Sequence, residues 1–362
     1  MKQPKDISIK ILADNRLSSF YLLSLIIPFR IDSTKYFFEL LNSLENLDTR
    51  VEIILVDDST EQRSLIEETA RKISNYKNCL LASFDQNHGV SFSRNIGIDL
   101  SRGKYVSFID SDDLINIEMI PEILTYIETH NTDMMCMRFG TFTTVADISF
   151  SLSESIVFSL SDKTGKELYS NYLYFDKTLD SYFFRSSCGK LFLRETIIAN
   201  SVAFPENVLN YEDACFLASF CSNSKTIVFC NGCDSFYYYR NNEKSVSKSY
   251  CSNLTERLSL YYSTFSKLNP SYKDVLCLDT LYLLLSALAK NEFLHSGQLR
   301  MKVIKNILDL PFVSKSFYDI QKINVSNSYN VFIKRIKKLS ALFPIIVSRL
   351  YLYLYLRKYL VK

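Results

Sequence analysis

Between residues 22 and 139, short and wholly apolar runs alternate with longer amphipathic segments, and this alternation restricts the fold more than any other feature. The apolar runs are LLSLIIP (22–28), VEIILV (51–56), CLLASF (79–84), YVSFI (105–109) and MMCMRF (134–139). The segments with helical spacing are 35–46, 62–74, 90–100 and 119–130. Strands that are covered on both faces of a parallel sheet are apolar throughout. The pattern therefore predicts an α/β fold with a doubly wound, mostly parallel sheet, which binds ligands at the carboxyl ends of its strands.

The remaining segments suggest how the chain is divided. Residues 1–20 precede the first apolar run and are predicted to form an N-terminal extension. One α/β domain is predicted over 21–250, with halves at 21–139 and 140–250. The second half contains a Ser-rich irregular stretch, a helix at 211–221 and strands at 227–229 and 234–240. A helical C-terminal region is predicted over 251–362, with helices at 254–268, 275–292 and 300–310.

The charge of the chain is unevenly distributed. The whole sequence has 42 Lys and Arg against 39 Asp and Glu, but residues 300–362 contain 13 basic and two acidic residues, which gives them a net charge of +11. Residues 331–343 have the spacing of an amphipathic helix with apolar residues on one face and basic residues on the other. This pattern suits contact of 331–362 with an anionic membrane surface, or packing against the main domain, and both remain open. Nucleic acid is not a predicted partner.

Cysteine usage and the length of the apolar runs predict a cytoplasmic protein. The nine Cys residues are scattered, no secretory signal is evident, and no apolar run reaches the ~20 residues of a spanning helix. Any membrane contact is then expected to be peripheral. The sequence Cys230-Asn231-Gly232-Cys233 invites a zinc or redox interpretation. With no second pair and no His nearby, Asn-Gly between two apolar runs favours a β-hairpin.

Acidic residues follow two of the predicted strands. The segment Asp110–Asp113 carries three carboxylates after the fourth apolar run, and Asp57 and Asp58 follow the second. Carboxylates this close raise one another's pKa, and a bound divalent cation relieves the repulsion. Mg²⁺ and Mn²⁺ bind through one or two carboxylates plus phosphate oxygens, so the pattern predicts a metal-bound diphosphate. The alternative is that Asp112 or Asp113 only caps the following helix.

Four motifs, in this order, resemble the family-2 nucleotide-sugar glycosyltransferases: ILVDDST (54–60), NHGVSFSRNIGI (87–98), KYVSFIDSDD (104–113) and YEDACF (211–216). The resemblance spans residues 22–250. It implies a GT-A fold in which 21–139 binds the nucleotide and 140–250 the acceptor. It also implies that Asp110-Ser111-Asp112 is the DxD motif, which holds a divalent metal, Mn²⁺ or Mg²⁺, on the donor diphosphate. Asp112 is then the main metal ligand, and Asp110 lies nearer the ribose.

The resemblance also implies which residues surround the nucleotide. The family usually has an aromatic or polar residue at the position of Arg30. The residues expected to line the base and uridine pocket are Pro28, Phe29, Arg30 and Asp58. Those expected near the same nucleotide are Asn87, Gly89 and Arg94, together with Asp110 and Ser111 of the DxD motif.

Further along the chain, Glu212-Asp213 corresponds to the acidic catalytic motif of the family. Asp213 is then the general base, because an acceptor hydroxyl that attacks the anomeric carbon must lose a proton, and Glu212 contacts the nucleotide-sugar. The alternative is that both acids lie in the first turn of a helix only for its dipole. Lys190 and Arg240 are each expected either to touch phosphate or acceptor or to be surface charges.

The predicted activity is the inverting, metal-dependent transfer of one sugar from a nucleotide-sugar, a UDP-sugar, to a glycan or lipid-linked glycan acceptor in bacterial polysaccharide or lipopolysaccharide biosynthesis. The chain has no Trp, so the QxxRW motif of processive synthases is absent and a single transfer is expected. A sugar nucleotidyltransferase is a second enzymatic interpretation, but no Gly-rich basic loop follows the first strand. The alternative outside enzymes is a catalytically inactive nucleotide-sugar-binding protein or a membrane-tethered scaffold. Whether the chain forms a homo-oligomer stays open.

Overall fold

The structure is a computed structural model that describes residues 8–31, 34–141, 156–159, 186–208, 211–230, 235–240, 253–268 and 309–319. The chain forms two compact units. The first comprises residues 1–168, 177–206 and 212–241, and the second comprises residues 169–176, 207–211 and 242–362. All the site residues predicted from the sequence fall in the first unit.

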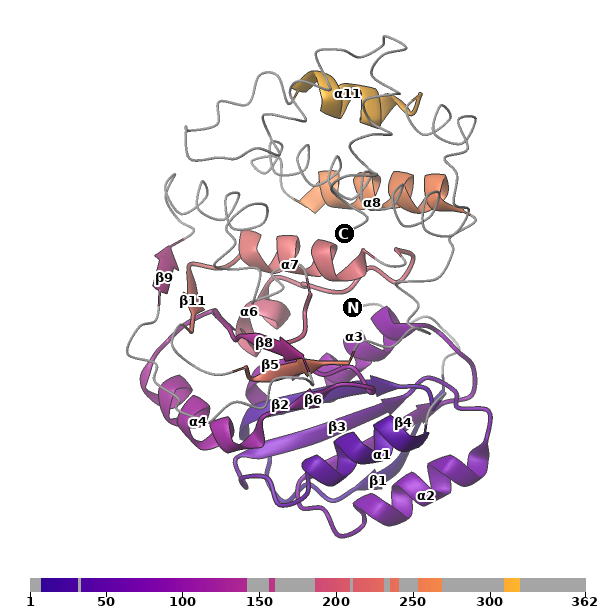
Figure 1. Ribbon diagram of the computed structural model, residues 1–362, viewed down its shortest axis with the longest axis vertical. Coiled ribbons are helices and arrows are strands. Elements are labelled where there is room, and N and C mark those ends of the chain that lie inside the picture. The colour runs from indigo at the N-terminus through magenta and orange to yellow at the C-terminus, as the bar shows by residue number, and fades with distance from the viewer. Residues whose placement is uncertain are drawn as a thin grey trace. The chain divides into compact units, whose positions relative to one another are not determined.

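A nine-stranded sheet forms the centre of the first unit (Figure 1). Its strands are β1 (Ile9–Asp14), β2 (Tyr21–Phe29), β3 (Val51–Asp57), β4 (Cys79–Phe84), β5 (Gly103–Phe108), β7 (Met134–Cys136), β9 (Ile156–Ser159), β10 (Lys190–Leu193) and β11 (Thr226–Phe229). The order is β1-β4-β3-β2-β5-β10-β7-β11-β9. Strands β2 to β5 are parallel, whereas β1, β9 and β10 run antiparallel to their neighbours. The predicted mostly parallel sheet is therefore confirmed.

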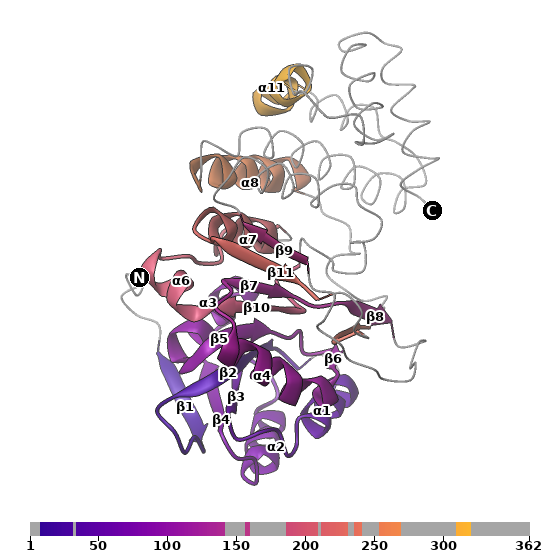
Figure 2. The same cartoon turned by 90° about the vertical axis from the view of Figure 1, so that its left-hand side faces the viewer.

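Helices cover both faces of this sheet. They are α1 (Thr34–Ser43), α2 (Arg63–Ile73), α3 (Val90–Leu100), α4 (Ile120–Thr129), α6 (Arg194–Ala199) and α7 (Glu212–Ser222). Helices α1 and α2 lie on one face and α3 on the other (Figure 2), which explains why β2 and β3 are buried along almost their whole length. Helix α3 packs closely on β2 because Gly97 has no side chain, and a Cβ atom there would collide with Ile26.

A second sheet of the same unit corrects two predictions. Its order is β6-β12-β8, with β6 (Leu114–Ile115), β8 (Phe139–Thr141) and β12 (Tyr237–Tyr239). The run at 134–139 is not one strand, because β7 belongs to the main sheet and β8 to the small one. The predicted hairpin around Cys230-Asn231-Gly232-Cys233 is also wrong, because β11 pairs with β7 and β9 whereas β12 pairs with β6 and β8. The short helix η1 (Ile117–Met119) joins β6 to α4.

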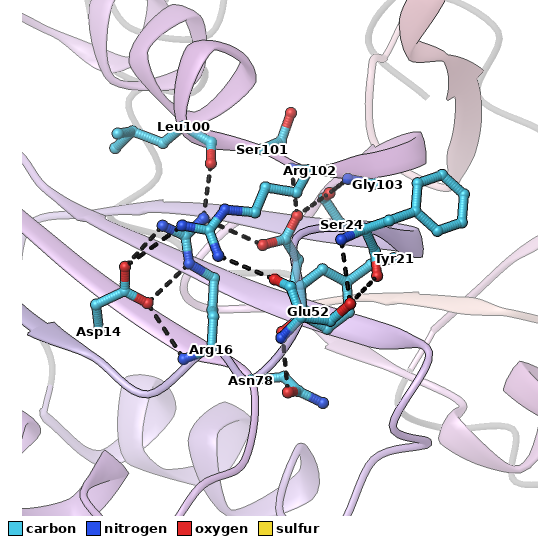
Figure 3. Close-up of polar contacts among 12 residues, drawn as sticks. Asp14, Arg16, Tyr21, Ser24, Glu52, Asn78, Leu100, Ser101, Arg102 and Gly103 are labelled. Carbon is cyan, nitrogen blue, oxygen red and sulfur yellow. Dashed lines mark hydrogen bonds and ion pairs between the residues drawn. The ribbon is translucent and has the colours of Figure 1, made fainter.

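The N-terminal segment, predicted as an extension, contributes a strand to the main sheet. Strand β1 pairs with β4, and Arg16 then enters a buried polar cluster at the amino ends of β2 and β3 (Figure 3). Arg16 pairs with Asp14 at 2.8 Å and with Glu52 at 3.2 Å, and it donates to the carbonyl oxygen of the last residue of α3 at 2.8 Å. The Ser24 hydroxyl donates to Glu52 at 2.7 Å. The cluster therefore ties the segment before β2 to β3 and α3.

Arg16→Ala is expected to lower the free energy of unfolding by about 3–5 kcal/mol, because it leaves the fully buried Glu52 carboxylate without its counter-charge. Urea unfolding followed by circular dichroism measures this loss. Arg50→Ala is the matched control, since Arg50 is 39% exposed and pairs with Asp48 and Glu128 near the surface. Its expected loss is below about 1 kcal/mol. Equal losses in the two variants would contradict a stabilising role for the buried cluster.

The second unit contains two described helices. Helix α8 (Leu254–Leu268) confirms the helix predicted there, and α11 (Pro311–Asp319) places Phe312 against Tyr262 with ring centroids 4.7 Å apart. The helix predicted over 275–292, almost all of the one predicted over 300–310, and the basic region at 331–362 lie outside the described residues. Within the ranges that the structure describes, no helix is both long and apolar enough to cross a bilayer.

Candidate active site

One buried arginine and three carboxylates meet at the carboxyl edge of the main sheet. Arg94 of α3 donates to Asp110, just after β5, at 2.9 Å. It also donates to Asp213 at 2.9 Å and to Glu212 at 3.3 Å, both in the first turn of α7. The Arg94 side chain is 4% exposed and that of Asp110 41% exposed. Arg94, predicted near the nucleotide, is therefore the buried counter-charge that joins Asp110 to the two acids of α7.

Burial and charge shift the pKa values of this cluster strongly. Burial alone would lower the pKa of Arg94, but the charges of Asp213, Asp110 and Glu212 raise it well above its ordinary value. Burial and the neighbouring Asp213 raise the pKa of Glu212 to about 7, although Arg94 acts in the opposite direction. Among the described residues, Oε2 of Glu212 is buried without a hydrogen-bond partner. A buried carboxyl group with a pKa near neutrality is typical of functional sites.

Asp213 is the more accessible acid of α7. Its side chain is 23% exposed, against 13% for Glu212. Its Oδ1 atom accepts hydrogen bonds from Arg94 at 2.9 Å and from the Ser187 hydroxyl at 2.8 Å. Because both donors bind the same oxygen, they orient the carboxylate while its other oxygen can face an acceptor hydroxyl.

The three acids at 110–113 form a tight turn between the two sheets, which we call the DSD turn (Asp110–Asp113). The backbone N of Asp113 donates to the carbonyl oxygen of Asp110 at 3.1 Å. Asp113 is 1% exposed, whereas Ser111 and Asp112 are partly exposed. Burial and the nearby Asp110 raise the pKa of Asp113 to about 8. The capping alternative is wrong, because Asn116 is the residue that caps η1.

The accessible acids of the DSD turn fit a divalent cation that phosphate also holds. Asp110 Oδ1 is paired with Arg94, and both Asp110 and Asp112 are partly exposed. In the part of the chain that the structure describes, no three His, Cys, Asp or Glu side chains gather around a common metal position. Two carboxylates suffice for Mg²⁺ or Mn²⁺ when diphosphate and water complete the coordination shell.

The loop before α3 is held by the acid at the end of β3. Asp58 accepts hydrogen bonds from the backbone N atoms of His88 at 2.7 Å and Gly89 at 2.9 Å, and burial raises its pKa. Gly89 has a φ of +88°, a conformation that favours glycine. The Asp58 carboxylate therefore fixes the conformation of this loop by binding the backbone N–H groups of the loop.

The remaining predicted pocket residues differ in exposure. Pro28 and Phe29 are buried, and the Phe29 ring stacks on Phe37 of α1 at 4.4 Å. Arg30 is exposed and its guanidinium pairs with Glu61 at 3.0 Å. Asn87 is exposed. Pro28 and Phe29 thus lie in the core, while Arg30 and Asn87 lie at the surface.

Lys190 is not a surface charge. It is fully buried, and its ammonium group donates to the carbonyl oxygens of Ser186 at 2.7 Å and Cys188 at 3.3 Å. Its Nζ lies 5.6 Å from the centroid of the Phe139 ring, and burial lowers its pKa. The surface-charge alternative is therefore wrong, and the ammonium group has buried carbonyl partners at the start of β10.

Sequence reasoning missed two hydroxyl groups of this site. Ser187 binds Asp213, and Tyr237 binds Asp113 at 2.7 Å. Ser187 lies in a Ser-rich stretch that gives no signal, and Tyr237 lies in a run of three Tyr residues. Proximity to Gly189-Lys190, a short stretch that resembles the family, was the one available hint for Ser187.

Comparison with known proteins gives a family match and several similar proteins. Residues 24–199 match the family described as Glycosyl transferase family 2. A cholesterol galactosyltransferase of Borreliella burgdorferi is 27% identical over 244 residues, which cover 63% of this chain and 64% of that protein. The poly(ribitol-phosphate) beta-N-acetylglucosaminyltransferase TarS of Staphylococcus aureus is 28% identical over 223 residues, which cover 60% of this chain and 35% of that protein. The matches thus span less than two thirds of the length of these relatives.

A solved structure shows the same fold. The structure of S. aureus TarS 1–349 in complex with UDP-GlcNAc has a TM-score of 0.60 at 21% identity, covering 91% of this chain and 87% of that one. The GT-A fold that the motifs imply is confirmed by this likeness. The family match includes most of β2, β3 to β5, the loop before α3, Arg94 and the DSD turn, and it ends before Glu212 and Asp213 of α7. Residues 24–199 therefore contain a family-2 glycosyltransferase domain.

Proposed function

We propose that the chain transfers a single sugar from a UDP-sugar to a glycan acceptor, with inversion at the anomeric carbon and with a divalent metal ion. The observation that carries the proposal is the pairing of Arg94 with both Asp110 and Asp213 at 2.9 Å. It brings the metal-binding motif and the base to the same edge of the sheet. An in-line displacement needs charge stabilisation on the departing side and a base on the attacking side.

Each acid has one role in this proposal. Asp112, with Asp110, would hold Mn²⁺ or Mg²⁺, which supplies charge stabilisation for the departing diphosphate. Asp213 accepts the proton of the attacking hydroxyl. Ser187 and Arg94 orient the Asp213 carboxylate for that step. The nucleoside would lie near the loop held by Asp58. The other residues proposed to surround it are Pro28, Phe29, Arg30 and Asn87.

The relatives support a more specific donor and acceptor. TarS was solved with UDP-GlcNAc, which favours a UDP-sugar as the donor. The relatives named above act on cholesterol or on poly(ribitol-phosphate). We therefore propose a cell-surface glycan, in lipid-linked or polymer-linked form, as the acceptor.

A thermal-shift panel of UDP-, GDP-, dTDP- and CMP-sugars tests the donor part. UDP-sugars with Mn²⁺ are expected to raise Tm by about 5 °C at a hundredfold excess over Kd, because a ligand that binds only the folded state stabilises it. The shift should be strongly reduced with chelator and in Asp112→Asn. A UDP-dependent shift that chelator leaves unchanged would contradict the metal role.

The thermal-shift panel, together with a measurement of UDP release, separates the enzyme from the non-catalytic alternatives. A nucleotide-sugar binder that is catalytically inactive would show the shift but release no UDP with any acceptor fraction. A scaffold without a donor site would show no shift with any nucleotide-sugar, with or without Mn²⁺. The proposed function requires both the metal-dependent shift and UDP release.

A further inference from the structure

Two residues from the end of the small sheet bind four atoms of the DSD turn. The Tyr237 hydroxyl donates to Asp113 Oδ2 at 2.7 Å and accepts from the backbone N of Asp110 at 3.0 Å. Arg240 donates from its backbone N to Asp113 Oδ1 at 2.7 Å and from Nε to the carbonyl oxygen of Asp112 at 2.8 Å. We call Asp113, Tyr237 and Arg240 the turn clamp. It fixes both ends of the turn, and the partly exposed Asp112 lies between them.

The turn clamp is itself anchored in two places. Tyr237 is 1% exposed and its ring packs on Phe139 of β8 with centroids 4.7 Å apart. The guanidinium of Arg240 lies 4.1 Å from the ring centroid of Tyr36, and its Nη2 pairs with Glu39 at 3.0 Å. Tyr36 and Glu39 belong to α1. The clamp therefore connects the DSD turn to the small sheet and to the helix that follows β2.

Burial of the Asp113 side chain restricts the DSD turn to one favoured position. A carboxyl group as buried as that of Asp113 needs hydrogen-bond partners in good geometry, because an unpaired buried polar group is destabilising. Both Asp113 oxygens have such donors, so the turn has one favoured position. A metal ligand whose surroundings are held by hydrogen bonds binds its metal more tightly than one that must be ordered on binding.

We propose that Tyr237 and Arg240 are positioning residues that hold Asp112 in place for the metal and the donor diphosphate. They act through the DSD turn and touch neither the metal nor the donor. The inference rests on the proposed metal-dependent function and adds to it the residues that determine how tightly the metal binds.

Mn²⁺ binding in the presence of UDP tests the proposal without using turnover. The electron paramagnetic resonance signal of free Mn²⁺ is followed while protein is added, and UDP binding in chelator is measured by calorimetry. Tyr237→Phe is expected to weaken Mn²⁺ binding by about 10-fold or more. UDP binding without metal should change less than about 2-fold, because no donor contact is removed. Arg240→Lys should weaken Mn²⁺ binding in the same direction, since Lys lacks the planar fork that reaches both Asp112 and Glu39.

Tyr105→Phe is the matched control. Tyr105 is also fully buried, and its hydroxyl donates to the Thr132 carbonyl oxygen at 2.8 Å, away from the DSD turn. It should lose stability like Tyr237→Phe, as measured by urea unfolding, with unchanged Mn²⁺ binding. Equal Mn²⁺ affinities in wild type, Tyr237→Phe and Arg240→Lys would overturn the clamp alone. Absence of Mn²⁺ binding by wild type with UDP, GDP, dTDP or CMP would overturn the metal-dependent function as well.

Discussion

Asp213→Asn is expected to lower kcat by about 10²–10⁴-fold, the usual contribution of a general base. The Asn side chain keeps the shape of Asp213, and its carbonyl oxygen can still accept hydrogen bonds from Arg94 and Ser187. What it loses is the ability to take the proton of the acceptor hydroxyl. Donor binding should therefore stay within about a factor of two of wild type. UDP release with acceptor and a thermal shift with UDP-sugar and Mn²⁺ measure the two quantities.

Asp133→Asn is the control for this substitution. The Asp133 carboxylate accepts from the Thr196 hydroxyl at 2.9 Å and from the backbone N atoms of Lys225 and Thr226 at 2.8 and 3.0 Å. It lies next to the amino end of β7, away from the carboxyl edge that holds the acids. This variant should lose stability but keep kcat. If Asp213→Asn kept kcat as well, the assignment of the base would be wrong.

Arg94→Met is expected to abolish detectable transfer and to lower the free energy of unfolding by about 3–5 kcal/mol, as measured by urea unfolding. Met fills a similar volume, but it leaves three carboxylates close together without their common counter-charge. Their repulsion should push the DSD turn away from the start of α7. The metal-binding motif and the base would then no longer lie side by side.

Arg94→Lys keeps this test informative if the Met variant fails to fold. Lys retains the charge, but as a point charge it cannot pair with Asp110 through one nitrogen and with Asp213 through another. The expected result is a folded protein with kcat lowered by about 100-fold or more. Arg194→Met is the control, because Arg194 binds Ser101 at 2.8 Å at the opposite end of α3. Full activity in Arg94→Lys would show that the geometry of the pairing does not matter.

The apolar runs predicted the parallel strands well because those strands are buried on both faces. The helix predicted at 90–100 and the one at 254–268 have the same bounds in the structure. The prediction failed where a segment pairs with a distant partner. Strand β1 is mostly exposed, so its sequence has no continuous apolar run, and its place in the sheet depends on pairing with β4.

The acids of the site were found in the sequence, but their partners were not. The motifs place Asp110, Asp112 and Asp213 at the ends of elements, where local spacing is informative. Lys190 shows the limit of such reasoning, because nothing in its neighbours along the chain indicates that it is fully buried. The role of Asp113 was equally hidden, because it depends on a hydroxyl that lies 124 residues away in the sequence.

The sequence by itself determined the layered α/β fold, the acidic strand ends and the family, since these depend on the period of apolar residues and on short motifs. Only the tertiary structure decided that one buried arginine serves three carboxylates, that Asp113 belongs to a clamp, and that β11 and β12 lie in different sheets. Most of those features join residues far apart in the sequence, such as Arg94 and Asp213, 119 positions apart, and Asp113 and Tyr237, 124 positions apart. Their free energy comes from burial and charge pairing, which local spacing does not reveal.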